Sequence, residues 1–87
     1  MMTGMEIARR AKEQLAQLTG LSPDTVSSFA KHQDGWHVTV EFVEMKRIPN
    51  STDMLGTYQA LLDDESNLLS YQRTKRYLRL QAMDKED

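Results

Sequence analysis

A chain of 87 residues is long enough for one domain and too short for two. It carries 11 Lys and Arg residues against 13 Asp and Glu residues, so it does not bind nucleic acid through an overall basic charge. It has no cysteine, which excludes disulfides and thiolate metal sites.

The first segment is predicted to be a helix that packs on a sheet. Its apolar residues recur at spacings of three and four and therefore share one stripe. Thr3 and Glu6 form the pattern of a capping box at its start, and Gly20 stands where a helix commonly ends. The stripe that we expect to be buried consists of Ile7, Ala8, Ala11, Leu15 and Leu18.

The segment that follows is less regular. Pro23 favours a turn or a single helical turn over residues 22–24. Residues 26–31 fit a short strand or a further helical turn. Asp34-Gly35 is the clearest local signal, because this pair favours the tight turn of a β-hairpin.

Two strands are predicted from the alternation of apolar and polar residues. The first begins after the turn, and the second covers residues 54–62, in which Thr57 and Gln59 lie on the polar face. Gly56 weakens this second strand and is typical of a bulge. The apolar face that the helix is expected to cover consists of Trp36, Val38, Val40, Phe42, Tyr58, Ala60 and Leu62.

A last strand is predicted over residues 68–80, and residues 83–87 form a charged tail. Consecutive strands joined by short turns pair antiparallel, and the helix can bury its stripe only on one face of the sheet. We therefore predict an α+β fold in a single domain over residues 1–82, with an N-terminal helix packed on a three- to four-stranded antiparallel sheet. Small PepSY-type modules have the same order of elements.

The last strand combines basic and aromatic residues. Simple alternation places Arg76 on one face of the strand. Tyr71, Arg73, Lys75, Tyr77 and Arg79 fall on the opposite face. Such a strip could dock an acidic protein surface, or stack bases and contact phosphates. It could also be neutralised inside the sheet by Glu41 and Glu44. The negative total charge disfavours nucleic acid. The candidate protein-binding residues are Tyr71, Arg73, Lys75, Arg76, Tyr77 and Arg79.

No sequence pattern indicates catalysis, a metal or another cofactor, and we expect none. Glu41 and Glu44 lie on opposite faces of one strand, and Asp53 lies in a loop, so they do not form the paired carboxylates of an acid–base site. His32 and His37 flank the hairpin turn. A metal site that used them with Glu41 would match no recognised ligand spacing.

Several short motifs stand in a characteristic order, namely the run DGWHVTVE at residues 34–41, Glu44, Arg47-Ile48-Pro49, Asp53, Tyr58 and Tyr71-x-Arg73-x-x-Arg76-Tyr77-x-Arg79. In this order and spacing, they resemble the gas vesicle protein GvpO family. The resemblance covers about residues 15–80. It implies an α+β accessory protein of gas vesicle formation that is not an enzyme and that contacts other accessory proteins or the small shell protein during assembly.

The remaining expectations concern location and partners. The chain begins without the basic and apolar regions of a signal peptide, and no apolar run approaches the length of a membrane span. We expect a cytoplasmic protein that associates with gas vesicles. If the last strand is a sheet edge, a partner could add a strand there, or two copies could pair as a homodimer. The alternatives are a regulator that contacts nucleic acid through the basic strand and a PepSY-like peptide-binding or inhibitory module.

Overall fold

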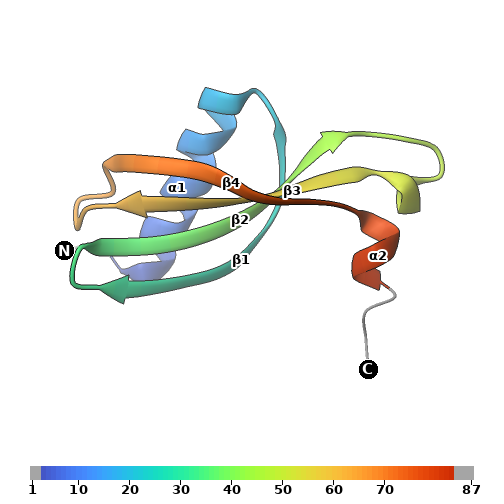
Figure 1. Ribbon diagram of the computed structural model, residues 1–87. Helices are drawn as coiled ribbons and strands as arrows, with labels where there is room; N and C mark the ends of the chain where they lie inside the picture. Colours follow the sequence, from blue (N-terminus) through green and yellow to red (C-terminus); the bar gives the residue numbers. More distant parts are fainter. Residues whose placement is uncertain (1–2, 84–87) are drawn as a thin grey trace.

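The computed structural model describes residues 3–83, in which one long helix covers one face of a four-stranded antiparallel sheet (Figure 1). The strands follow each other across the sheet in the order β1-β2-β3-β4, so β1 and β4 are its edges. This architecture confirms the predicted α+β fold. The elements are α1 (Gly4–Thr19), β1 (Ser22–His32), β2 (Gly35–Met45), η1 (Asn50–Thr52), β3 (Met54–Leu62), β4 (Leu68–Leu78) and α2 (Arg79–Met83).

The long helix α1 begins and ends where its capping residues predict. Thr3 Oγ1 accepts a hydrogen bond from the Glu6 N–H at 3.2 Å, and Glu6 Oε1 accepts one from the Thr3 N–H at 3.1 Å. At the other end Gly20 has a φ angle of 73°, and its N–H donates to the carbonyl oxygen of Ala16. Glycine adopts this left-handed conformation at little cost, which makes it a common helix terminator.

The predicted stripe of α1 is buried except for its last member. Leu18 is 60% exposed, because the final turn of the helix extends past the covered sheet surface. Ala16 and Leu21 pack against the core at this end instead. The buried part of the stripe consists of Ile7, Ala8, Ala11 and Leu15.

The sheet face under α1 is the predicted one. Val38, Val40 and Phe42 of β2 are fully buried, and the ring of Phe42 packs edge-on against Tyr58 of β3 with 5.3 Å between the ring centroids. Trp36 lies at the margin of this core and is partly buried. The alternation of β2 and β3 therefore predicted the core correctly.

The first strand is longer than the sequence predicts. Residues 22–24 belong to β1 and do not form a turn, and residues 26–31 are strand. Pro23 is tolerated because β1 is an edge strand, where a missing N–H need not break a hydrogen-bond ladder. The predicted hairpin follows directly, since His32 pairs with Gly35 around a two-residue loop.

The last strand is shorter than predicted. It ends at Leu78, and residues 79–83 form the short helix α2. The Arg79 N–H donates to the carbonyl oxygen of Asp53, and the Leu78 N–H donates to Gln81 Oε1. These bonds turn the chain out of the sheet. Met83, expected in the tail, is the last residue of α2, and residues 84–87 lie outside the described residues.

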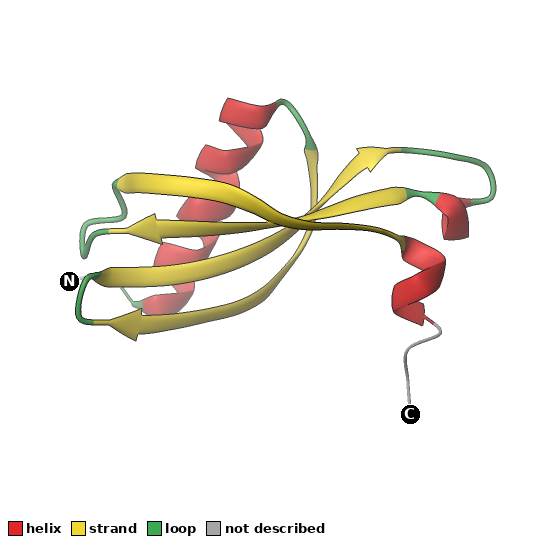
Figure 2. Cartoon of the chain, in the orientation of Figure 1, coloured by secondary structure: helices red, strands yellow, loops and turns green. Residues whose placement is uncertain are grey.

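Both tight turns lie at one end of the sheet, and the longer β2–β3 loop lies at the other end, close to α2 (Figure 2). Gln14 of α1 fixes the β3–β4 turn from the helix side. Its amide nitrogen donates to the carbonyl oxygen of Ser66 at 2.7 Å, and its oxygen accepts from the Leu68 N–H at 3.3 Å. The β2–β3 end has no comparable support from α1.

Replacing Leu15 by alanine should lower the free energy of unfolding by about 2–5 kcal/mol, because it removes a fully buried side chain from the helix–sheet contact. Leu18→Ala makes the same chemical change on the same helix. It should alter stability by no more than about 0.5 kcal/mol, since Leu18 is exposed. Urea denaturation of both variants measures the difference, and similar losses would contradict the packing described for α1.

Candidate functional site

Five of the six candidate protein-binding residues lie on β4, an edge strand that exposes most of its side chains. The sixth, Arg79, is the first residue of α2. Thr57 and Tyr58 of β3 pair with Lys75 and Arg73, so Thr74 is an extra residue on β4. Such a β-bulge shifts the alternation of side chains by one position. The structure thereby contradicts the prediction of one face made of Tyr71, Arg73, Lys75, Tyr77 and Arg79.

The bulge divides the strand between the two faces of the sheet. Tyr71, Arg73 and Arg76 lie on the face that packs under α1. Lys75 and Tyr77 lie on the opposite face. Simple alternation would place Arg73 and Arg76 on opposite faces. The bulge instead makes them neighbours on the same face.

Arg73 and Arg76 converge on the carboxylate of Glu44, which reaches from β2 across β3. Glu44 Oε1 lies 3.3 Å from Arg73 Nη1 and accepts a hydrogen bond from Arg76 Nε at 2.9 Å. Its other oxygen accepts a hydrogen bond from the Tyr58 hydroxyl at 2.8 Å. The Glu44 side chain is only 7% exposed. These two arginines are thus partly neutralised inside the sheet, as one interpretation of the sequence proposed.

Gly56 makes room for the carboxylate of Glu44. A Cβ atom at position 56 would overlap Oε2 of Glu44 and lie 2.8 Å from its Cδ. β3 itself has no extra residue at Gly56, but both neighbouring strands bulge beside it, at Glu44 and at Thr74. A glycine inside a strand often marks such a close approach, and this was the available sequence signal for the cluster.

Opposing effects set the pKa of Glu44. Burial alone would raise the pKa of its carboxyl. The hydrogen bonds from Tyr58 and Arg73 and the charges of Arg73 and Arg76 outweigh burial, so the pKa lies below its ordinary value. Ionised Glu44 therefore stabilises the fold above the ordinary pKa of glutamate, and this contribution is lost as the pH falls through the lowered pKa.

On the opposite face, Glu41 of β2 connects all four strands. Its Oε1 accepts hydrogen bonds from Thr57 Oγ1 in β3 at 2.6 Å and from the Tyr77 hydroxyl in β4 at 2.8 Å. Its Oε2 accepts one from Ser27 Oγ in β1 at 2.9 Å. Within residues 3–83 Glu41 has no ion-pair partner, so it does not neutralise a basic residue of β4 as one interpretation of the sequence proposed. Lys75 instead places its Nζ 5.4 Å from the centroid of the Tyr77 ring.

Arg79 lies beyond the strand surface and links three segments. Its Nη2 is 3.2 Å from Asp53 Oδ2 and 3.3 Å from Asp24 Oδ1. Asp53, whose side chain is 1% exposed, also accepts a hydrogen bond from the Arg47 N–H at 2.7 Å. Arg79 therefore connects the start of β1, the loop before β3 and α2, and it is a structural residue.

Part of β4 stays accessible after these internal contacts. Tyr71 is 42% exposed, and the side chains of Arg73 and Arg76 are 45% and 53% exposed. Lys75 is also exposed and has no ion-pair partner in the described part of the chain. Because β4 is an edge strand, its outward backbone N–H and C=O groups are free to pair with another strand.

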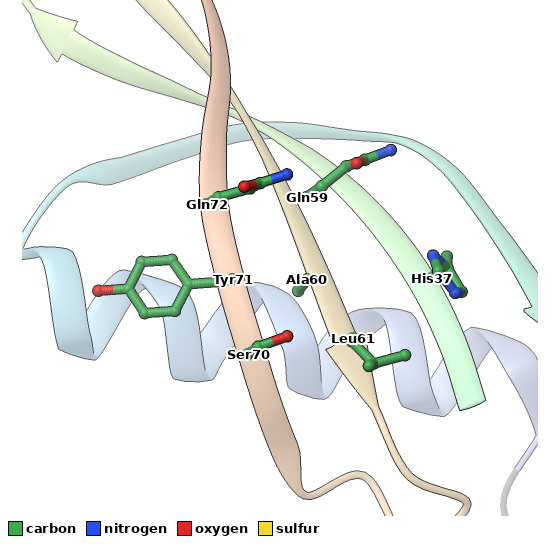
Figure 3. A pocket seen from close by; sticks show the side chains of 7 residues that line it. All are labelled: His37, Gln59, Ala60, Leu61, Ser70, Tyr71 and Gln72. Atoms are coloured by element: carbon green, nitrogen blue, oxygen red, sulfur yellow. The ribbon is translucent and has the colours of Figure 1, made fainter. Parts of the chain in front are cut away.

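A shallow hollow of about 270 Å³ lies over β2, β3 and β4 (Figure 3). Gln59, Ser70 and Gln72 point to one side of the strands, whereas Tyr71 points to the other (Figure 3). The His37 ring at its margin pairs with Asp34, with 2.9 Å between Nε2 and Oδ1. The hollow is open and its lining mixes polar and apolar groups, which makes it an exposed surface rather than an enclosed substrate site.

The histidines of the hairpin do not meet a third metal ligand. The rings of His32 and His37 lie 4.4 Å apart between centroids, but Glu41 is bonded to three hydroxyl groups. Across residues 3–83, no group of three or more His, Cys, Asp or Glu side chains is arranged to hold a metal ion. In the same residues, no helix is long and apolar enough to cross a membrane.

The protein is thus a small α+β module with an accessible strand edge. Residues 1–83 match the family model described as "Gas vesicle synthesis protein GvpO". The chain belongs to this family, as its motifs predict. The matched residues include every helix and strand of the fold.

Curated relatives carry related names. Gas vesicle protein O of Streptomyces sp. (strain CB03234) is 41% identical over 75 residues, which is 86% of this chain and 59% of the relative. Gas vesicle protein O1 of Halobacterium salinarum is 29% identical over 70 residues, 80% of this chain and 59% of the relative. Gas vesicle protein O of Haloferax mediterranei is 36% identical over 50 residues, 58% of this chain and 36% of the relative. The chain therefore spans 59% or less of the length of these relatives. No solved structure matches.

Replacing Gly56 by alanine should destabilise the protein by about 1–3 kcal/mol, the usual cost of overpacking, because the new methyl group overlaps the carboxylate of Glu44. In a Glu44→Ala background that space is empty, so the same substitution should cost clearly less. A double-mutant cycle by urea denaturation measures the coupling. Equal costs in the two backgrounds would show that Glu44 does not occupy the space beside Gly56.

Tyr77 should make stability sensitive to alkaline pH. Burial and the hydrogen bond to Glu41 raise the pKa of Tyr77 to about 12. In the unfolded chain the pKa of a tyrosine phenol is about 10. Its contribution to stability is therefore complete below a pH of about 10 and is lost as the pH rises toward 12. Tyr77→Phe should remove the tyrosinate absorbance transition that occurs at the highest pH. It should also flatten the dependence of the free energy of unfolding on pH between these two values. Persistence of that transition in the variant would mean that another tyrosine produces it.

Proposed function

We propose that this chain takes part in gas vesicle formation as an accessory protein that binds other gas vesicle proteins through the edge strand β4. The observation that carries the proposal is an unpaired strand edge bordered on both faces by accessible basic and aromatic side chains. An extended segment of a partner can add to such an edge through backbone hydrogen bonds. The family description, which names gas vesicle synthesis, supports the process.

The side chains beside this edge favour an acidic partner. Lys75 is unpaired within the described residues, and Arg73 and Arg76 keep about half of their side-chain surface exposed although they contact Glu44. Cations on both faces of an added strand would select acidic residues on both faces of that strand. The edge therefore supports recognition of an extended segment with acidic side chains on both of its faces.

The division of the cations disfavours the nucleic-acid interpretation. A single-strand platform needs aromatic and basic side chains together on one surface. Here Tyr71 and Tyr77 lie on opposite faces, and Glu44 neutralises part of the charge of two arginines. Protein docking needs no common face, because strand addition uses the edge itself.

A pull-down against each of the other gas vesicle proteins tests the proposal. Reversing Arg73, Arg76 or Arg79 would place negative charge beside Glu44 or Asp53 and disturb the fold, so these residues are left intact. The double variant Tyr71→Ser/Lys75→Glu changes only exposed side chains and should weaken binding about tenfold or more. If the variant still binds every protein that the unchanged chain binds, the proposal is overturned.

The matched control is Leu18→Ser/Arg10→Glu, which makes a similar apolar loss and the same charge reversal on exposed positions of α1. It should bind as the unchanged chain does. Amide hydrogen exchange on the complex adds a direct readout, since strand addition should protect amides of β4 and leave those of the other edge, β1, unchanged. Protection confined to β1 or α1 would place the contact elsewhere.

A further inference from the structure

The loop between β2 and β3 presents a fully exposed apolar side chain. Ile48 is 100% exposed and Met45, at the end of β2, is 48% exposed. The loop lies at the end of the sheet that α1 leaves uncovered (Figure 1). It contains Arg47-Ile48-Pro49, a motif that the docking of a strand at β4 does not use.

Single exposed apolar residues are common on protein surfaces, but this loop is also fixed by hydrogen bonds on both sides of Ile48. Before it, the Arg47 N–H donates to Asp53 Oδ1 at 2.7 Å. After it, the carbonyl oxygen of Pro49 accepts from the Thr52 N–H at 3.0 Å and from Thr52 Oγ1 at 2.7 Å. The side chain is therefore held outward on an ordered backbone.

The loop is also anchored to the rest of the fold. Asp53, which bonds the loop backbone, is 1% exposed in its side chain and forms an ion pair with Arg79 of α2. Arg79 in turn contacts Asp24 in β1. A preformed loop loses little conformational entropy when it binds, so more of the contact energy appears as affinity.

The charges around Ile48 indicate what kind of surface it fits. Lys46 and Arg47 precede it, are exposed, and have no ion-pair partner within residues 3–83. The Arg47 guanidinium contacts the sulfur of Met45, with 3.3 Å between Nη2 and Sδ. The nearby carboxylate of Asp53 is occupied by Arg79 and by backbone. The loop thus offers one apolar side chain beside two exposed cations without ion-pair partners in residues 3–83, although the charge of Lys46 also acts on Asp53.

We propose that residues 46–49 form a preformed docking loop, in which Ile48 enters an apolar pocket bordered by carboxylates on another protein. Lys46 and Arg47 pair with those carboxylates, since opposite charges at the rim of a contact steer and orient the partners. This contact is separate from the β4 edge and does not depend on it.

A photo-crosslinking amino acid placed at position 48 tests the proposal in producing cells, with and without the other gas vesicle proteins. The expected result is a crosslink to another protein, mapped by mass spectrometry to an apolar surface with neighbouring Asp or Glu residues. The same group at position 5 is the control, because Met5 is 76% exposed but lies on α1 beside β1, away from both the loop and β4. Equal crosslinking at both positions, or none at 48, would overturn the proposal.

Two variants then test the chemistry against the partner identified by the crosslink. Ile48→Ser should weaken binding about tenfold or more, the order expected when a buried isoleucine contact is lost. Lys46→Glu/Arg47→Glu should weaken it similarly and make it less sensitive to salt. Met5→Ser should bind normally, and all variants should keep the thermal midpoint within about 2 °C because the changed side chains are exposed. Unchanged affinity in Ile48→Ser would overturn the proposal.

The remaining outcomes separate this proposal from the function proposed for β4. A crosslink that appears only when gas vesicle proteins are present supports the docking loop with one of those proteins as its partner. One that appears without them, to an acid-rimmed surface, supports the docking loop and counts against gas vesicle proteins as its partners. A crosslink to a second copy of this chain, or Ile48-dependent binding to anionic lipid vesicles, would overturn the docking loop in favour of a homodimer or a membrane surface.

Discussion

Two carboxylates of β2 hold the outer strand β4 from opposite faces of the sheet. Glu44 reaches across β3 to Arg73 and Arg76, and Glu41 reaches across it to Tyr77. A domain of this size has a modest core, and here α1 covers only part of one face. Because an uncompensated buried charge is costly, the partners of Glu44 are fixed as firmly as the carboxylate itself. The position of β4, and therefore the surface it offers, depends on this pair of acids.

Local chemistry made most of the fold predictable. The capping residues of α1, the Asp34-Gly35 turn and the alternation of β2 and β3 are decided within a few residues, and all three predictions are confirmed. The extent of β1 and the end of β4 were not predictable in this way. Arg79 leaves the strand because it bonds Asp53 and Asp24, which lie 26 and 55 residues away in the sequence. Long-range partners of this kind leave no local pattern.

Prediction of the candidate site from the sequence has the same limit, because a single extra residue changes the direction of the side chains. Its residues and its place at a sheet edge follow from composition and strand order, but the direction of each side chain does not. The bulge at Thr74 arises from the pairing of β4 with β3 and from the carboxylate of Glu44, which fills the space beside Gly56. Nothing within residues 71–79 indicates an extra residue. The sequence therefore predicted which strand is basic, whereas the structure shows that its cations are shared between an internal network and both outer surfaces.

The order of the strands has a consequence for how the chain folds. Each strand pairs with its neighbour in the sequence, so the sheet closes no long loop and its contact order is low. Hairpins can form one after another as the chain emerges, and each new strand covers the edge left by the previous one. β4 is the last strand in this series. Of the two edges that remain open in the finished sheet, β4 is thus the one exposed for the shorter time before folding is complete.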